Sequence, residues 1–484
     1  MSTDPLPFSP KPEAHRADKE YLRPEPADMA PASKDHETHQ LGRKRRMSSM
    51  SRLMGHLAYS EPEARPVWCI GVITLEKNPG IAETRRYLKE RLLKMPRFRS
   101  KLVVHRWGGH FEEVPVDDGY HFEVACYGKR ATQDDLNEVV ASINTWPFHA
   151  DKPLWKVIHV PEFIDGTSVI IVCVNHAIGD GVALVNVFVK LCDIEEDLKQ
   201  RASHTGKRKT GPPVSVATKA KMAVYGTYEA MFATMFRNDY KNALKLQGSP
   251  SPKKVVAASP DVIALQRIKD IAAKVGDGVT VNDVLMANYV RTLRAFFVEV
   301  GDERVVSGKR AVRSQFPVNV RKRNEGPCNH EGDPNNRFGF GMITLPLDFK
   351  DSTELIRRIK HKIDEVKVSP APRLAYATLP GYMATLPRPV LLKVLLDSVN
   401  ISTAQLSNVP GPQVGVALAG AHVVRFSFFL FSTLGLYFGV ASYNGEVSCS
   451  VNMDASIGQD PRQLVKHWGP QFEKMHAEIM GGAL

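Results

Sequence analysis

A histidine ends an apolar run in the first half of the chain and is followed closely by a carboxylate and a glycine. The segment 171–181 reads IVCVNHAIGDG, so that His176 comes four residues before Asp180-Gly181. A neutral imidazole, with an ordinary pKa of about 6.5, can take up a proton near neutral pH. A histidine at a strand end, before a glycine-containing turn, projects into a cleft rather than a core. A lone histidine is more often structural, and the spacing to Asp180-Gly181 is what favours a general base at His176.

The neighbours of His176 have predicted roles of their own. Asn175 carries an amide, which forms hydrogen bonds but does not titrate, and we interpret it as a group that positions the histidine. Gly181 and the glycine before it allow a sharp turn and the close approach of another part of the chain. The carboxylate of Asp180 can hold the loop through an arginine.

The elements around His176 alternate between strands and helices, which predicts an α/β layer. Strands are expected at 66–75, 96–104, 154–160 and 168–176, and helices at 83–94, 134–143 and 181–194. The second half of the chain has a similar mixture. Helices are expected at 260–274, 280–297, 352–367, near 390–399 and at 460–479, and strands at 312–321, 338–347, 401–408 and 423–441. A hairpin over 441–454 should turn at Asn444-Gly445, since this dipeptide tolerates positive φ.

The length of 484 residues predicts two domains, because one core rarely serves so long a chain. Residues 1–50 form a Pro-rich and basic tail that we expect to be disordered. Its end, GRKRRMSSMS (42–51), is read as a solvated basic tether, with contact to anionic lipid or phosphorylation at Ser48 as alternatives. Residues 51–195 and 261–484 are the two predicted domains. The segment 196–260 is read as the crossover between them, with an Ala/Met-rich helix at 216–236 that serves packing or a membrane surface.

The bulk composition is that of a globular protein, with 43% hydrophobic and 24% charged residues. The net charge of +12 suits an anionic ligand or membrane surface. A nucleic-acid partner is disfavoured because no basic stripe alternates with aromatic residues. The six cysteines lack CxxC spacing and are interpreted as reduced thiols of a cytosolic protein. Neither a signal peptide nor a transmembrane segment is predicted.

The segment NHAIGDG resembles the HHxxxDG signature of the coenzyme A-dependent acyltransferase superfamily. His176 matches the second, catalytic histidine, and Asn175 replaces the first. Five further segments occur in order and make residues 50–480 similar to the wax ester synthase/diacylglycerol acyltransferase family. They are PLW (153–155), VNDVLMA (281–287), PVNVR (317–321), NRFGFGMITLPL (336–347) and SNVPGP (407–412).

This resemblance implies two chloramphenicol-acetyltransferase-like α/β domains, with mixed sheets flanked by helices and an active-site tunnel between them. It also implies transfer of a long-chain acyl group from acyl-CoA to a fatty alcohol or to diacylglycerol. His176 would take the proton of the hydroxyl, and no acyl-enzyme would form, so that Cys173 would be an inert buried thiol. Acyl-CoA is then a co-substrate, and neither a bound cofactor nor a metal is expected. The alternatives are another alcohol acceptor, such as a short or branched alcohol or a sterol, and an inactive lipid-binding homologue in which Asn175 marks decay of the motif.

The resemblance carries roles to residues outside the histidine segment. Asn282 is a candidate oxyanion donor, although the TVND capping box alone would explain it. Arg321 is the expected partner of Asp180. Trp155 would line the acyl or alcohol channel or simply pack, since its ring is large and apolar.

The turn SNVPGP would shape the tunnel, with Ser407 and Asn408 as ligand donors. The basic run 321–323 could contact the phosphates of coenzyme A or could be solvated. The segment 338–341 permits close backbone approach, for binding or packing. We expect peripheral contact with a membrane, the endoplasmic reticulum or a lipid droplet, and leave the oligomeric state open.

Overall fold

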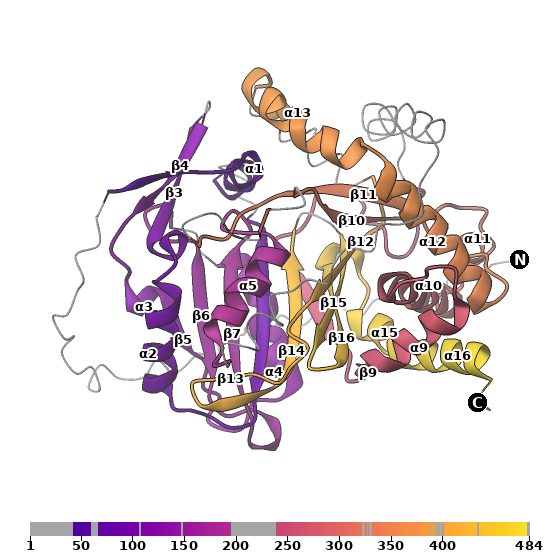
Figure 1. The fold of residues 1–484 in the computed structure, drawn as a ribbon, viewed down its shortest axis with the longest axis horizontal. Helices are drawn as coiled ribbons and strands as arrows, with labels where there is room; N and C mark the ends of the chain where they lie inside the picture. The colour runs from indigo at the N-terminus through magenta and orange to yellow at the C-terminus, as the bar shows by residue number, and fades with distance from the viewer. Residues whose placement is uncertain are drawn as a thin grey trace, which may run out of the picture.

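A computed structural model describes most of the chain. The described residues are 42–59, 66–105, 108–146, 149–194, 239–321, 325–326, 328, 332–387, 389–391, 393, 397, 401–432 and 435–481. The helix expected at 216–236 and most of the predicted crossover lie outside them. Two large sheets stand side by side, and helices cover them (Figure 1).

The first sheet has the strand order β13-β14-β2-β7-β6-β5. Its strands are β2 (Trp68–Leu75), β5 (Phe122–Val124), β6 (Trp155–Val160), β7 (Ser168–Asn175), β13 (Ala417–Leu418) and β14 (Ala421–Phe431). Every residue of β6 and β7 is buried, because helices cover both faces of the sheet. Alternate residues of β7 therefore face two cores. Val172 and Val174 pack toward α2 (Ile81–Leu92) and α5 (Gly181–Leu191), whereas Ile171 and Cys173 pack toward α4 (Gln133–Ser142).

The second sheet has the order β11-β10-β12-β15-β16-β8, with β9 paired to β16. Its strands are β8 (Lys254–Ala258), β9 (Ile263–Ala264), β10 (Arg313–Asn319), β11 (Phe338–Thr344), β12 (Ala404–Pro410), β15 (Leu436–Tyr443) and β16 (Glu446–Asp454). Its helices are α9 (Leu265–Val275), α10 (Val281–Glu299), α11 (Glu303–Val306), α12 (Ser352–Val368), α13 (Ala371–Thr385), α15 (Pro461–Val465) and α16 (Trp468–Met480). The β15–β16 hairpin turns at Asn444-Gly445, with φ of 47° and 78°, which confirms that prediction.

A small third sheet shows that the predicted disordered tail extends too far. β1 (Lys44–Arg46) pairs with β4 (Gly108–Glu113), which pairs with β3 (Ser100–His105). α1 (Ser49–Ala58) begins directly after it, and Ser48 caps this helix by accepting a 3.1 Å hydrogen bond from the Ser51 N–H. Arg45 also forms an ion pair with the buried Glu113. Basic residues that looked solvated are therefore used in strand pairing and in an ion pair.

The chain crosses between the two sheets near its end, which differs from the predicted domain division. Residues 423–431 of β14 pair with the whole of β2, and this brings residues 421–431 from the predicted second domain into the first sheet (Figure 1). The run 423–441 is thus two strands in different sheets, since β15 pairs with β12 and β16. Hydroxyls of Ser448 and Ser450 on β16 donate to carbonyls of β14, so the two sheets are joined here.

Three other expectations need correction. β8 belongs to the second sheet, although 254–258 was assigned to the crossover. The strand expected from 96 begins at Ser100, after the 3₁₀ helix η2 (Pro96–Arg99). The sequence does not predict the helix α13, because prolines at 370, 372 and 380 are typical of a loop or a helix end.

Candidate active site

His176 lies directly after the buried central strand β7. Its backbone N–H donates to the Val67 carbonyl at 2.8 Å, and the N–H of Asn175 donates to the Leu154 carbonyl at 2.9 Å. The imidazole is 8% exposed and its centroid lies 5.1 Å from the ring of Phe338, on β11 of the second sheet. Nδ1 has no hydrogen-bond partner among the described residues. The histidine therefore lies where the two sheets meet.

Burial controls the charge of this imidazole. It lowers the pKa of His176 below its ordinary value, and the negative charge of Asp180 opposes that shift without reversing it. Burial disfavours the charged form of a histidine because the imidazolium loses its hydration. His176 is therefore neutral at neutral pH, which is the state that a general base needs.

Asn175 shapes the turn that carries the histidine. Its side chain is fully buried, and Oδ1 accepts a 2.9 Å hydrogen bond from the Ala177 N–H across the histidine. Its carbonyl accepts a 3.0 Å bond from Ile178. The side chain thus mimics a backbone turn around His176, in the geometry that a positioning group requires.

Asp180 connects the histidine loop to the second domain. One carboxylate oxygen accepts from the Ala183 N–H at 3.1 Å and caps α5. The other accepts from the Arg337 N–H at 2.9 Å and lies 2.7 Å from the guanidinium of Arg321. Both side chains of this ion pair are buried, at 4% and 6% exposure. The predicted pairing of Asp180 with Arg321 is confirmed.

A neighbouring asparagine was missed by the sequence reasoning. Asn336 is fully buried, and its Nδ2 donates to the carbonyls of His176 at 2.6 Å and Ala177 at 3.2 Å and to the Ser51 hydroxyl at 3.0 Å. It comes from the segment 333–338, which also holds Arg321 through Asn335 at 2.7 Å. The motif NRFGFG marked this segment as a whole but did not single out its asparagine.

Arg97 is a second residue that the sequence did not reveal. It is 4% exposed, and its guanidinium donates to the Ile178 carbonyl at 2.7 Å. Its backbone N–H donates to Asp333 at 2.9 Å. Burial lowers the pKa of Arg97 to about 10, so it stays charged at neutral pH. The histidine turn is therefore held from the first domain by Arg97 and from the second by Asn336.

The two glycines of the motif differ in whether the fold leaves room for a side chain. A Cβ at Gly179 would lie 2.8 Å from Cβ of Pro334, too close for a real side chain. A Cβ at Gly181 would lie 3.6 Å from Val409, an ordinary contact. The close approach expected in this turn thus occurs at Gly179, where the segment 333–338 crosses it.

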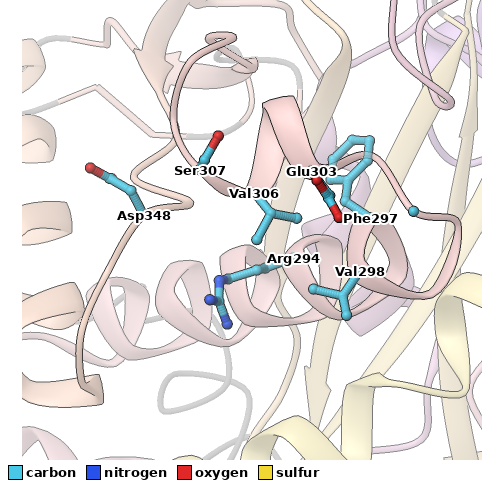
Figure 2. A pocket seen from close by; sticks show the side chains of 8 residues that line it. Arg294, Phe297, Val298, Glu303, Val306, Ser307 and Asp348 are labelled. Carbon is cyan, nitrogen blue, oxygen red and sulfur yellow. The ribbon is translucent and has the colours of Figure 1, made fainter.

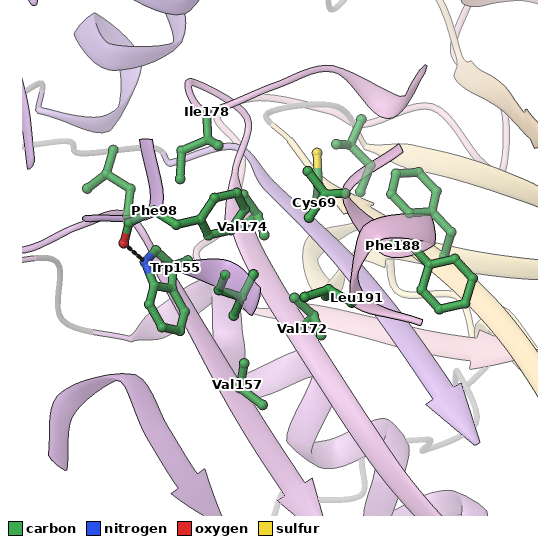
Figure 3. Packing of buried hydrophobic residues seen from close by; sticks show 14 of the residues in the cluster. Cys69, Phe98, Trp155, Val157, Val172, Val174, Ile178, Phe188 and Leu191 are labelled. Carbon is green, nitrogen blue, oxygen red and sulfur yellow. Dashed lines mark hydrogen bonds between the residues drawn. The ribbon is translucent and has the colours of Figure 1, made fainter. Parts of the chain in front are cut away.

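Trp155 is accounted for by packing (Figure 3). Its ring is 1% exposed, and its indole N–H donates to the Phe98 carbonyl at 2.6 Å. It stacks on His121 at 4.2 Å. The described contacts favour the packing alternative over a channel wall.

The NDVLMA and SNVPGP segments meet as side chains. Asn408 Nδ2 donates to Asn282 Oδ1 at 3.3 Å. The predicted Thr280–Asp283 capping box is also present at the start of α10. Val409, next to Asn408, lies against Gly181, so β12 passes beside the start of α5. Ser407 is buried in β12, and a contact of Ser407, Asn282 or Asn408 with substrate stays a prediction.

Two observations bear on other chemistry. Burial raises the pKa of the Cys173 thiol, which excludes a ready thiolate at this position. A separate cavity of about 630 Å³ is lined by the end of α10, by α11 and by Asp348 (Figure 2). Its lining includes Arg294, Phe297 and Val298, and none of the lining residues belongs to the His176 loop.

The fold of two sheets flanked by helices is shared with solved structures of other proteins. The first condensation domain of the calcium-dependent antibiotic synthetase is 12% identical, with a TM-score of 0.59 over 90% of this chain and 97% of that one. The wax ester synthase/diacylglycerol acyltransferase of Marinobacter aquaeolei VT8 is 17% identical, also with a TM-score of 0.59, over 90% of this chain and all of that one. The chain therefore has a condensation-domain-like two-domain fold.

Models of known protein families show the family to which the chain belongs. The wax ester synthase/diacylglycerol acyltransferase catalytic domain matches residues 50–285, and the C-terminal domain of the same family matches 335–476. Wax ester synthase/diacylglycerol acyltransferase 6 of Arabidopsis thaliana is 22% identical over 85% of this chain and 90% of its own length. A putative diacylglycerol O-acyltransferase of Mycobacterium tuberculosis is 24% identical over 84% and 85%. The chain belongs to the wax ester synthase/diacylglycerol acyltransferase family and is an acyl-CoA-dependent O-acyltransferase.

Proposed function

We propose that this protein transfers a long-chain acyl group from acyl-CoA to the hydroxyl of a fatty alcohol or of diacylglycerol, with His176 as general base. The observation that carries the proposal is the state of His176. It is buried and neutral, and its turn is held by Asn175, Asn336 and the Asp180–Arg321 pair. A base fixed in this way has lost most of its freedom before substrate arrives.

The proposed reaction has two steps and no acyl-enzyme. His176 takes the proton of the acceptor hydroxyl as the hydroxyl oxygen attacks the thioester carbonyl. The tetrahedral oxyanion then collapses, the carbon–sulfur bond breaks, and the imidazolium returns the proton to the sulfur of coenzyme A. The ester and free coenzyme A leave.

Asn282 is the proposed donor to the oxyanion. Its Oδ1 accepts from Asn408, which leaves the Nδ2 group as the donor end of the amide. A donor that is already oriented costs little reorganisation when charge develops on the substrate oxygen. In this proposal Asn408 orients Asn282, and Ser407 and Asn408 lie on the wall of a tunnel between the domains.

The proposed substrates also suggest that the protein works at a lipid surface. Fatty alcohols and diacylglycerol partition into membranes and lipid droplets, and the chain carries a net charge of +12, which favours anionic headgroups. Within the described ranges, no helix is long and apolar enough to span a membrane. We propose peripheral contact with the endoplasmic reticulum or with lipid droplets.

The test is release of coenzyme A from palmitoyl-CoA, with hexadecanol or diacylglycerol as acceptor. His176→Ala should lower acceptor-dependent release by about a hundredfold to ten-thousandfold, the range that a general base contributes. His159→Phe is the matched control, because His159 is also buried and has no hydrogen bond at either ring nitrogen among the described residues. This control should retain activity.

The pH profile supplies a second readout. Because the pKa of His176 is lowered, the acid limb of kcat/KM should lie below the ordinary histidine value of about 6.5. Folded protein that releases no coenzyme A with either acceptor would contradict these substrates. A His176→Ala protein with full activity would contradict the mechanism.

A further inference from the structure

The helix α13 has an outer surface unlike that of its neighbour. α12 exposes Arg357, His361, Glu365 and Lys367, as is usual for a helix in water. α13 exposes one charged residue, Arg373, and otherwise residues that are apolar, small or threonine. Leu374 is 39% exposed and Tyr382 is 48% exposed. They are eight positions apart, so they lie on the same side of the helix, about 12 Å apart along its axis.

Two threonine hydroxyls on this surface donate hydrogen bonds within the helix. The hydroxyl of Thr378 donates to the Leu374 carbonyl at 2.9 Å, and that of Thr385 donates to the Gly381 carbonyl at 2.9 Å. Both threonines therefore have no need of water as a hydrogen-bond acceptor. These two hydroxyls can leave water without losing the hydrogen bonds that they donate.

Basic residues outnumber acidic ones beside this surface, although Lys367 pairs with Asp364 and Lys393 pairs with Asp397. Residues 366–396 contain no Asp or Glu, whereas Lys367, Arg373, Arg388 and Lys393 are basic. Arg373 and Lys393 are exposed. β1 and α1, on the same side of the molecule, add the exposed Lys44 and Arg46, and α1 contacts α13 (Figure 1). An apolar surface bordered by an excess of basic residues complements the headgroups of anionic lipids.

The inner face of α13 leads to the active site. Leu379 and Met383 are buried in the same core cluster as Phe338, whose ring lies beside His176. Pro372, in the first turn, packs so closely on β11 that a Cβ at Gly339 would lie 2.3 Å from its carbonyl oxygen. On β11, Phe340 is 38% exposed and its centroid lies 5.4 Å from that of Phe338. An aromatic series therefore runs from the histidine to the surface near this helix.

We propose that the outer face of α13 docks the enzyme on an anionic lipid surface, beside the route by which a lipid acceptor reaches His176. α13 projects from the body of the molecule (Figure 1), and Leu374 and Tyr382 are exposed on it. The docking site is defined by Leu374, Tyr382 and Arg373. The proposal rests on the proposed function for its acceptor, but the docking itself does not depend on which acceptor is used.

The experiment is flotation of the full chain with vesicles of phosphatidylcholine, with or without phosphatidylserine. Wild type should float with the mixed vesicles, and more weakly with neutral ones or at high salt. Leu374→Glu/Tyr382→Glu should lower the bound fraction by about tenfold or more, because two apolar side chains are replaced by anions. Val298→Glu/Val424→Glu is the matched control, since these residues are 57% and 48% exposed elsewhere, and it should float like wild type.

The activity of the same variants separates this inference from the proposed function. With an acceptor presented in detergent micelles, Leu374→Glu/Tyr382→Glu should release coenzyme A at the wild-type rate, whereas with acceptor in vesicles it should be slower by about the loss in binding. Equal flotation of this variant and wild type would overturn the docking site. Flotation that depends on α13 in a protein without acyl transfer would keep the docking site and reject the proposed function.

Discussion

At the scale of single residues, Asn175 shows how a departure from the superfamily motif is accommodated. The function of its amide is to accept a hydrogen bond from the Ala177 N–H, while Nδ2 has no partner among the described residues. A histidine in its place could accept through a ring nitrogen. We therefore expect that a side chain that closes this turn can take the place of the first histidine of the motif.

Asn175→His should keep kcat within about tenfold of wild type, a change of roughly 1.4 kcal/mol in barrier. Asn175→Leu, similar in volume but without an acceptor, should lose more, because the buried Ala177 N–H is then unpaired. Steady-state coenzyme A release by both variants is the measurement. Loss of activity in Asn175→His together with full activity in Asn175→Leu would contradict a positioning role.

At this same scale, the sequence predicts residues whose type and spacing indicate a chemical role. It does not predict residues whose role depends on contacts with distant parts of the chain. His176 and Asp180 stand at a spacing that has a chemical meaning, and the arginine of PVNVR could be matched to Asp180. Arg97 and Asn336 hold backbone carbonyls of residues 81 and 160 positions away. Nothing local in their neighbourhoods predicts those contacts, since Arg97 reaches Ile178 only when the first domain folds and Asn336 reaches His176 only when the two domains meet.

At the scale of elements, the segment 333–338 is the part of the second domain that forms hydrogen bonds with the histidine loop. It supplies Asn336, the Arg337 N–H and the carbonyl of Asn335, and Arg321 bonds to it. The Asp180–Arg321 pair is buried in this contact. Removing one partner of a buried ion pair is costly because the remaining charge is left in a poor solvent.

Asp180→Asn should therefore lower the free energy of unfolding by about 3 kcal/mol. In an Arg321→Met background the same change should cost much less, since no buried guanidinium is then left uncompensated. Urea denaturation of the four proteins measures this coupling. Glu473→Gln is the control, because its bidentate pair with Arg267 is exposed and should contribute less than about 1 kcal/mol. Additive losses in the double variant would refute the coupling.

The sequence predicts some helices and strands well and others not at all. Periodicity locates β7, α5, α10 and the β15–β16 hairpin well, because each is a long local pattern. It does not tell β14 from a strand of the second sheet, because Phe426 and Phe428 would be apolar in either. Nor does it find α13, where prolines suggest a loop and the outer face lacks the charges that usually reveal a surface helix.

At the scale of the whole molecule, the first domain buries several histidines in their neutral form. Besides His176, it holds His121 and His159, and burial lowers the pKa of each to about 4. In the unfolded chain both would titrate near the ordinary value of about 6.5. The unfolded state therefore takes up protons first as the pH falls, and stability is lost between these two values.

The free energy of unfolding should fall as the pH is lowered from about 6.5 to about 4, by at most about 3 kcal/mol for each of these two histidines. His159→Phe removes one of them without breaking a described hydrogen bond, because neither ring nitrogen of His159 has a partner among the described residues. Its stability should thus depend less steeply on pH in this window than that of wild type. Urea denaturation at a series of pH values compares the two slopes, and identical slopes would show that His159 is not held neutral by the fold.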